Sequence, residues 1–315
     1  MLNAPWEADV FLSGEDAARL IEAQFPELVP VRLERIGAGW DNDAYQVNGR
    51  WVFRFPRRQI AAALIEREAD ALPRLAPHLP LPVPTPVFAG VPGDGYPYPF
   101  AGYAHLSGTT ACRIAWTDHA RAANAALLAH FLATLHAVPV DDELRGRVPG
   151  DTIGRTDLAA RAAQFKERLR VLAPDLPDLC PGHDAATLAA LADRLARTPP
   201  HAGPPVIVHG DLYARHLLVA DAAKTVCGVI DWGDVHIGDP ALDLSLAFSF
   251  LPPGKARETF RVAYARPIDE PTWNRARFRA LWYGAILTLY GGHVGDDALR
   301  SVGVYALQAA TAADD

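Results

Sequence analysis

Two aspartates stand just beyond short apolar runs in the second half of the chain. Asp211 follows Val206–Val208 within H-G-D-L, and Asp231 follows residues 226–230 within I-D-W-G-D. Short β-branched runs that end in Gly, Asp or His are typical of buried strands. Two adjacent strands of this kind would present both carboxylates at one edge of a cleft. Phosphoryl transfer needs such a pair, one carboxylate to orient the attacking hydroxyl and another to hold Mg²⁺ against a nucleotide.

Each of these positions also has a purely structural interpretation. Asp211 could cap a helix or turn, and Asp231 could begin a strand-end turn, although unrelated turns seldom reproduce both contexts together. His216 lies five residues after Asp211, where protein kinases place an Asn that binds a second metal ion. Imidazole is a softer ligand than an amide oxygen, so a metal site with His216 would hold Mg²⁺ less well and tolerate Mn²⁺ better. Alternatively, His216 only packs beside the site.

Phosphate contacts are expected from the N-terminal region. Gly37 and Gly39 lie between two predicted strands, where backbone N–H groups of a loop could cover phosphates. Arg54 interrupts the apolar run W-V-F-R-F and needs a carboxylate partner unless it faces solvent. Glu68 on the next predicted helix is the favoured partner, with Glu66 as the competitor. No G-x-x-x-x-G-K-[S/T] occurs in the sequence, which excludes the phosphate loop of P-loop NTPases.

The N-terminal third reads as a short helix followed by strands. An amphipathic helix is predicted from Gly14, and extended runs at 31–36, 44–47 and 51–55 follow, with Asn48-Gly49 as a hairpin turn between the last two. A helix over residues 59–75 comes next, and a further extended segment covers 99–106.

The rest of the chain is predicted to be mainly helical. Helices are expected at 118–136, 157–173, 185–197 and from 255 to the end, with two short strands in the region around 209–243. We therefore expect an α+β protein in two lobes, with residues 1–106 as a nucleotide-binding lobe, 107–315 as a helical lobe with the catalytic loops and acceptor site, and a hinge at about 103–108. The ligand is expected between the lobes.

Composition narrows the partners and the compartment. The 315 residues carry a formal net charge of −7, which argues against nucleic acid and is compatible with a cationic ligand. Cys112, Cys180 and Cys227 show no C-x-x-C spacing, as expected in a reducing cytosol. No secretory signal is visible, and the apolar stretch at 280–292 is too short for a bilayer, so we expect a soluble, cytoplasmic protein.

Six motifs together resemble the aminoglycoside phosphotransferase family, small-molecule kinases with a protein-kinase-like fold. The resemblance spans residues 36–246, and its N-terminal half is most similar to the 2″-aminoglycoside kinases. The motifs are G-A-G-W-D-N-D-A-Y-Q-V-N, W-V-F-R-F-P-R-R, E-R-E-A-D-A-L-P, F-A-G-Y-A-H-L-S-G, H-G-D-L and I-D-W-G-D.

The resemblance implies a role for most of the residues singled out above. Asp211 would be the catalytic base and Asp231 a metal ligand. The segment Tyr103, Ala104, His105 and Leu106 would be the hinge whose backbone groups pair with the purine. Two positions depart from the family pattern: Arg54 replaces the usual phosphate-binding Lys, and His216 replaces the usual Asn, as in the macrolide kinases of the same family.

The leading hypothesis is a kinase that transfers the γ-phosphate of ATP or GTP, with Mg²⁺ or Mn²⁺, to a hydroxyl of an aminoglycoside-type antibiotic. The alternatives are a macrolide, a metabolite such as choline, homoserine or a sugar amine, or a non-catalytic nucleotide-binding module. Acidic residues that could face a polyamine sugar are more simply surface charges, and aromatic residues that could enclose an apolar ligand are more simply core. These are Asp157, Asp234, Glu258 and Asp269, and Trp273, Trp282 and Tyr283.

Overall fold

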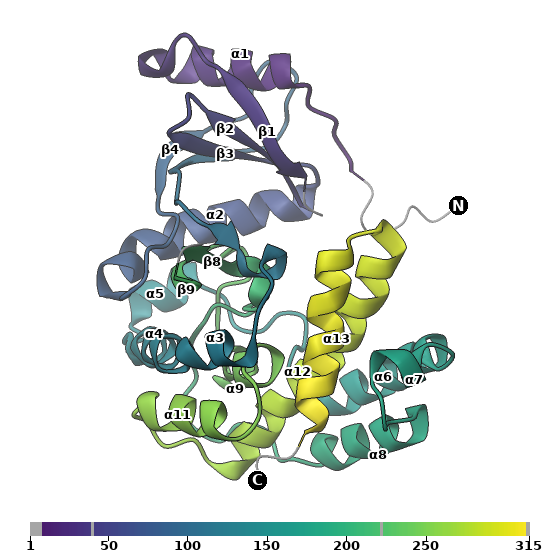
Figure 1. Cartoon of the computed structure of the whole chain (residues 1–315). Helices are drawn as coiled ribbons and strands as arrows, with labels where there is room; N and C mark the ends of the chain where they lie inside the picture. Colours follow the sequence, from purple (N-terminus) through teal and green to yellow (C-terminus); the bar gives the residue numbers. More distant parts are fainter. Residues whose placement is uncertain (1–7, 39–40, 221–222, 313–315) are drawn as a thin grey trace. The chain divides into compact units, whose positions relative to one another are not determined.

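The computed structural model describes residues 8–38, 41–220 and 223–312 (Figure 1). By their internal contacts these residues form two compact units. The first consists of Met1–Pro77, Pro82–Ser107 and Asp231–Val235, and the second of His78–Leu81, Gly108–Ile230 and His236–Asp315. Asp231 therefore belongs to the first unit, although the chain on both sides of Asp231–Val235 belongs to the second.

The first unit contains a five-stranded antiparallel sheet with the order β1-β2-β3-β5-β4. Asn48 and Gly49 both have positive φ, 53° and 68°, as a two-residue hairpin turn between β2 and β3 requires. The predicted hairpin is thus confirmed. The strands are β1 (Leu33–Ala38), β2 (Asn42–Val47), β3 (Trp51–Pro56), β4 (Pro86–Gly90) and β5 (Phe100–Ala104).

Two helices accompany the sheet. The Ser13 hydroxyl accepts a hydrogen bond from the backbone N–H of Asp16 and so caps α1, the amphipathic helix that the sequence predicted. The helices are α1 (Gly14–Gln24) and α2 (Gln59–Leu75), with 3₁₀ turns η1 (Pro26–Leu28) and η2 (Ala76–His78) after them.

Alternation along β3 separates the core of the first unit from its site. Phe53 and Phe55 are buried in an aromatic cluster, where Phe55 stacks on Phe100 with ring centroids 4.6 Å apart. Phe53 lies over Gly102, where a Cβ would come within 2.5 Å of its ring, so only glycine fits there. Because successive strand residues face opposite sides, Arg54 emerges on the other face of the sheet. There it contacts Glu68 on α2.

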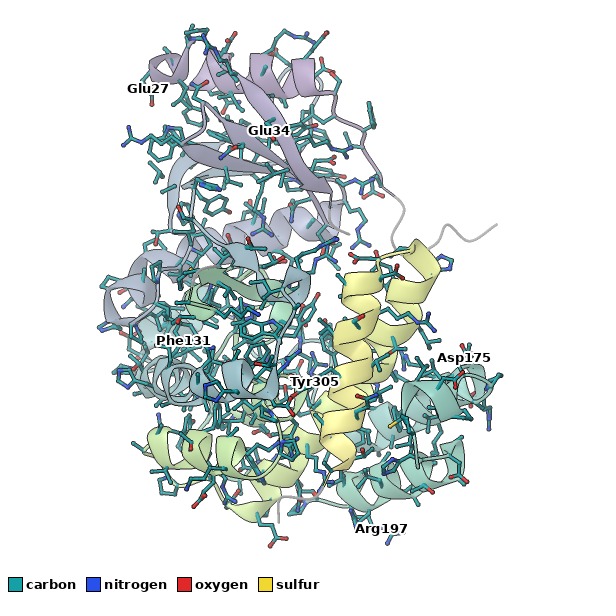
Figure 2. The ribbon with its side chains drawn as sticks, viewed as in Figure 1. Glu27, Glu34, Phe131, Asp175, Arg197 and Tyr305 are labelled. Atoms are coloured by element: carbon teal, nitrogen blue, oxygen red, sulfur yellow. The ribbon has the colours of Figure 1, made fainter. Side chains whose placement is uncertain are left out.

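The second unit is mainly helical, which together with the N-terminal sheet confirms the predicted α+β class. Figure 2 shows Phe131 of α4 among the packed side chains of this unit, where it is fully buried. Its helices are α3 (Asp118–Ala123), α4 (Ala125–Ala137), α5 (Asp142–Arg147), α6 (Leu158–Leu172), α7 (Leu176–Leu179), α8 (Ala185–Ala196), α9 (Ala241–Leu244), α10 (Leu246–Ser249), α11 (Lys255–Ala263), α12 (Glu270–Val294) and α13 (Asp297–Thr311), with 3₁₀ turns η3 (Ala111–Arg113) and η4 (Ala214–His216). Over the described ranges, no helix is long and apolar enough to cross a bilayer.

Two small sheets in the second unit correct the predicted strand pairing. The sheets are β10-β7 and β6-β8-β9, formed by β6 (Thr109–Thr110), β7 (Val206–Val208), β8 (Leu217–Ala220), β9 (Thr225–Val229) and β10 (His236–Gly238). We expected the two runs that precede Asp211 and Asp231 to be adjacent strands, and this prediction was wrong. The apolar run Leu217–Ala220, which the sequence analysis did not assign, pairs with β9 as a hairpin, while β7 pairs with β10.

The helix predicted over 118–136 is interrupted at Asn124, which is 2% exposed. Its side-chain amide donates to the carbonyl groups of Ala120 and Lys224, both at 2.9 Å. Its oxygen accepts from the N–H of Val226 at 2.8 Å. A buried Asn that satisfies backbone groups of the β8-β9 hairpin competes with helical hydrogen bonding, so the helix ends and restarts there.

Replacement of Asn124 by Ala should lower the free energy of unfolding by about 2–4 kcal/mol, because buried backbone groups of Lys224 and Val226 lose their partners. Urea unfolding followed by circular dichroism would measure this loss. Thr134→Ala is the matched control, since its exposed hydroxyl bonds only a carbonyl of its own helix. An equal effect of both changes would show that the contacts of Asn124 do not stabilise the hairpin.

Candidate active site

Arg54 joins two carboxylates in the first unit. Its Nη1 donates to Oε2 of Glu68 and its Nη2 donates to Oδ1 of Asp231, each at 2.8 Å. Glu68 is fully buried, while its competitor Glu66 is exposed. The contact of Arg54 with Glu68 that the sequence indicated is therefore present, and Asp231 is a second partner that the sequence did not reveal.

The Arg at position 54 has a geometric consequence. A guanidinium presents separate N–H groups in a rigid fork, so it can hold two carboxylates at once, whereas a lysine ammonium is a single point charge. In this chain the fork connects helix α2, through Glu68, with the Asp231–Val235 segment. The replacement of the family's usual Lys thus adds a fixed link between two of the predicted site residues.

Burial and charge act in opposite directions on this pair. Burial lowers the pKa of Arg54, but the charges of Glu68 and Asp231 raise it by more than burial lowers it. The net pKa therefore lies above its ordinary value. For Glu68, burial raises the pKa and the Arg54 charge opposes that shift, so the net pKa is raised. Arg54 therefore carries a permanent positive charge in an otherwise apolar setting, as a phosphate contact requires.

The backbone around Asp231 is held by the same glutamate. Asp231 has a φ of 67°, in the left-handed region that residues other than glycine rarely adopt. The N–H of Trp232 donates to Oε2 of Glu68 at 3.2 Å, and the indole of Trp232 is fully buried. Gly233 lies against Leu64 of α2, so close that a Cβ would stand 3.1 Å from that side chain. The left-handed turn therefore directs the Asp231 carboxylate while its neighbours anchor the loop.

The predicted hinge, residues 103–106, begins at the end of strand β5 of the first unit. Tyr103 and Ala104 end β5, and the side chain of Tyr103 is buried. The N–H of His105 donates to the carbonyl of Arg50 at 2.9 Å, so this N–H is already used within the first unit. The purine contacts predicted for the hinge would therefore have to come from its other backbone groups, including those of Leu106.

Gly37 lies in β1 with no atom within 4 Å of where its Cβ would be. Gly39 lies outside the described residues. The position of Gly37 would therefore also accept a residue with a small side chain.

In the second unit, one buried carboxylate shapes the turn that carries Asp211. Asp243 accepts the N–H of His209 at 2.7 Å and the N–H of Gly210 at 2.9 Å, one on each oxygen. Gly210 has a φ of 82°, which a residue with a side chain adopts only with strain. His136 contacts the same carboxylate at 3.3 Å through Nε2. These hydrogen bonds make Asp243 a support for the turn that carries Asp211.

Two histidines flank Asp211 and have complementary hydrogen bonds. His209 donates from Nε2 to the carbonyl of Ile230 at 3.1 Å and accepts the N–H of Asp211 at Nδ1, 3.3 Å away. His216 has its Nδ1 2.8 Å from the carbonyl oxygen of Asp211, an acceptor only, so Nδ1 is the protonated nitrogen. Nε2 of His216 is consequently the nitrogen with a lone pair when the ring is neutral.

Arg279 and Tyr283 of α12 also lie at Asp211, and the sequence analysis did not place them there. Arg279 Nη2 is 3.6 Å from Oδ1 of Asp211, and its guanidinium lies over the Tyr283 ring at 4.3 Å. Burial and the Asp211 charge raise the pKa of Tyr283 well above its ordinary value, so its hydroxyl stays protonated beside Asp211. Their spacing of four residues, about one helical turn, places both on the same face of α12, but nothing in the sequence links that face to Asp211.

The donor groups near the predicted metal ligands fit Mg²⁺ held partly by a nucleotide. The Asp231 side chain is 46% exposed and only its Oδ1 is given to Arg54. Within the described part of the chain, no cluster of three or more His, Cys, Asp or Glu residues could enclose a metal by itself. Mg²⁺ commonly binds through one or two carboxylates together with substrate phosphates and water, so a complete protein cage is not required.

Comparisons with known proteins show the family to which the chain belongs. The sequence model of the phosphotransferase enzyme family matches residues 32–281. The GDP and kanamycin complex of APH(2″)-IIIa is 25% identical, with a TM-score of 0.67 and coverage of 94% of this chain and 98% of that chain. The macrolide 2′-phosphotransferase MphH from Brachybacterium faecium is 23% identical, with a TM-score of 0.59 and coverage of 93% and 97%. ADP-bound APH(2″)-Ib is 17% identical, with a TM-score of 0.58 and coverage of 94% and 99%.

Replacement of Arg54 by Lys should destabilise the protein by about 1–3 kcal/mol, because one ammonium cannot hold Glu68 and Asp231 together. Chemical denaturation measures the change. Arg50→Lys, at an exposed position of the same hairpin, is the matched control and should stay within about 0.5 kcal/mol of the parent. A neutral Arg54→Lys variant would mean that the double ion pair contributes no stability.

Replacement of Asp243 by Asn should cost about 2 kcal/mol or more at pH 7, because two N–H groups lose a charged acceptor. Burial alone would raise the pKa of Asp243, but the hydrogen bond and charge of His136 and further contacts lower it below its ordinary value of 3.8. A depressed pKa means that this stabilisation is complete above that value and lost as the pH falls below it. The difference in stability between parent and variant should therefore be constant above pH 3.8 and should shrink as the pH falls below it. Unfolding curves measured from pH 7 to pH 2 test this, and a difference that stayed constant over the whole range would contradict the assignment.

Proposed function

Because the chain belongs to the phosphotransferase enzyme family, we propose that this small-molecule kinase transfers the γ-phosphoryl group of ATP or GTP to an alcohol, with Asp211 as the catalytic base. The observation that carries the proposal is the clamped turn at Asp211. Its carboxylate is 20% exposed, while the backbone beneath it is held by the buried Asp243. A carboxylate that is fixed in direction yet open to a ligand suits the orientation of an attacking hydroxyl.

The neighbours of Asp211 define what it can do. The protonated Tyr283 lies beside the carboxylate and Arg279 lies near its Oδ1, so both limit the directions from which a hydroxyl can approach. Phosphoryl transfer proceeds through a loose transition state, in which positioning and charge stabilisation matter more than early proton removal. Asp211 is therefore proposed to align the acceptor hydroxyl and to receive its proton as the O–P bond forms.

The residues of the first unit are proposed to receive the nucleotide. Arg54, with its permanent charge, contacts the phosphates, and Glu68 orients it from α2. Gly37 and Gly39 cover the phosphates, and the backbone of Tyr103, Ala104, His105 and Leu106 lies at the purine. Mg²⁺ would be held by Asp231 and by Nε2 of His216, and would neutralise charge on the phosphates. The imidazole at position 216 makes Mn²⁺ a competent substitute.

The acceptor class is a separate proposal from the reaction. The similar structures include an aminoglycoside kinase bound to kanamycin and a macrolide kinase, so the comparisons support both acceptor classes and a role in antibiotic resistance. Three of the acidic residues considered for a polyamine sugar have structural roles instead. Asp157 caps α6 through Ala160, Asp269 caps α12 through Thr272, and Glu258 pairs with Lys255.

Replacement of Asp211 by Asn should reduce kcat by about 10²–10⁴-fold and leave nucleotide affinity within about twofold, because the amide cannot accept the proton. Phosphate transfer is measured with ATP and GTP, each with Mg²⁺ and Mn²⁺, and nucleotide binding by calorimetry. Asp193→Asn, which removes a surface carboxylate paired with Lys166, is the control and should leave kcat unchanged. Turnover near the parent level in Asp211→Asn would assign the base to another residue.

A further inference from the structure

Three guanidinium groups surround the indole ring of Trp282 in the second unit. The Cζ atoms of Arg161 and Arg279 each lie 4.9 Å from a Trp282 ring centroid, and that of Arg168 lies 5.6 Å away. Arg161 and Arg168 are one heptad apart on α6, which packs against α12, the helix of Trp282 and Arg279. Three positively charged groups are therefore gathered around one aromatic side chain.

Most arginines near this ring have a carboxylate partner. Arg155 pairs with Asp151 at 3.4 Å, Arg275 with Asp239 at 2.6 Å, and Arg279 with Asp211 at 3.6 Å. One acidic residue therefore matches each of these three positive charges.

Arg161 and Arg168 differ from those three arginines. Arg161 donates only to neutral oxygens: the carbonyls of Ile153 and Gly154 and the side chain of Gln164. Arg168 makes no hydrogen bond or ion pair with any residue that the structure describes. Two positive charges beside Trp282 thus lack a protein carboxylate.

The proximity of these charges is unfavourable in the absence of a ligand. Burial and the charge of Arg161 both lower the pKa of Arg168, and no carboxylate opposes the shift. Two half-buried cations repel each other, and the free energy of this repulsion falls when an anion binds between them. Guanidinium groups with spare donors are the usual protein ligands of carboxylate and phosphate groups.

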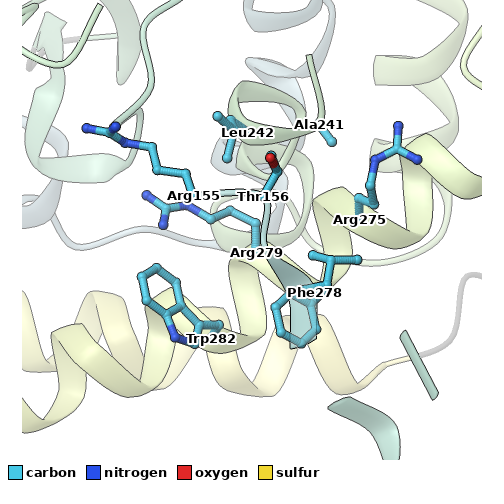
Figure 3. A pocket seen from close by; sticks show the side chains of 9 residues that line it. Arg155, Thr156, Ala241, Leu242, Arg275, Phe278, Arg279 and Trp282 are labelled. Atoms are coloured by element: carbon cyan, nitrogen blue, oxygen red, sulfur yellow. The ribbon is translucent and has the colours of Figure 1, made fainter. Parts of the chain in front are cut away.

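Trp282 supplies a further donor next to a pocket. Its side chain is 6% exposed, and its Nε1–H has no acceptor among the described residues. Figure 3 shows Trp282 and the guanidinium groups of Arg279 and Arg155 around this pocket. The empty space in this pocket, about 260 Å³, includes open solvent, so the pocket is accessible from outside.

One residue, Arg279, belongs both to the pocket and to the surroundings of the candidate catalytic base. It lines the pocket and also lies 3.6 Å from Asp211. We propose that Arg161, Arg168 and Trp282 form a subsite for an oxyanion group, a carboxylate or a phosphate, of the acceptor, whose hydroxyl is phosphorylated at Asp211. This inference rests on the proposed function, since it names the acceptor class of the same site. It disfavours the cationic acceptor that net charge suggested, because an ammonium group would meet like charges here.

The first experiment tests the subsite without catalysis. Thermal unfolding is measured with increasing sodium sulfate, against sodium chloride at equal ionic strength, with saturating ADP or GDP to occupy the phosphate contacts of the nucleotide site. The parent should be stabilised at lower sulfate than Arg168→Gln or Arg161→Gln, with sulfate affinity about tenfold weaker in each variant. The general salting effect of sulfate is common to all variants and cancels.

The matched control is Arg170→Gln, two residues along the same helix, where the exposed arginine pairs with Glu167. It should respond to sulfate as the parent does. Without sulfate, Arg168→Gln should be at least as stable as the parent, because the change removes repulsion. An identical sulfate response in the parent, Arg168→Gln and Arg170→Gln would overturn the subsite.

The second experiment tests the acceptor class with compounds that differ in one substituent. Phosphate transfer is compared for glucose, glucosamine, glucuronate and glucose 6-phosphate, with kanamycin as a polycationic arm. The anionic sugars should have the higher kcat/KM. Arg168→Gln should raise KM for them about tenfold without changing kcat, since it contacts only the remote substituent. The carboxylate and phosphate arms identify which oxyanion is preferred.

The outcomes separate the two proposals. Transfer to kanamycin or to the neutral and cationic sugars in preference to the anionic ones would leave the kinase function standing and overturn the anionic acceptor. Binding of nucleotide with no transfer to any acceptor would contradict the proposed function, while the sulfate experiment would still decide whether the oxyanion subsite exists.

Discussion

The turn that carries the proposed base Asp211 depends on the ionised and fully buried carboxylate of Asp243. A charge at this depth is stable only when hydrogen bonds replace its water shell, and here two consecutive backbone N–H groups and His136 do so. The N–H groups can converge on one carboxylate only if the chain turns sharply at Gly210. That turn directs Asp211 outward, so the need to satisfy one buried charge determines the position of the proposed base.

The first unit solves a similar problem with an ion pair instead of backbone donors. Glu68 is fully buried, and Arg54 and the N–H of Trp232 are its hydrogen-bond partners. The second end of the Arg54 fork then holds Asp231, whose left-handed backbone would otherwise be an unfavourable conformation. Arginine at this position therefore forms a structural link between Glu68 and Asp231 that lysine cannot form.

Arginine residues also determine the sign of the local charge at the proposed acceptor subsite. Carboxylates that might have attracted a polyamine are used as helix caps or in surface pairs, whereas Arg161 and Arg168 have no carboxylate partner among the described residues. A net negative charge over the whole chain therefore says little about the local field at a site. The sign of that field depends on which charges are paired, and pairing is a property of the folded chain.

The sequence by itself determined the family, the α+β class, the Asn48-Gly49 hairpin and the pairing of Arg54 with Glu68. These features depend on short-range patterns, such as a turn that requires positive φ or a cation within an apolar strand that requires a nearby acid. The tertiary structure decided that β7 and β9 belong to different sheets, that Asn124 interrupts a helix, and that Arg279 and Tyr283 lie at Asp211. It also decided which arginines lack carboxylates. Each of these outcomes depends on contacts between residues far apart in the chain, and local propensity carries no information about them.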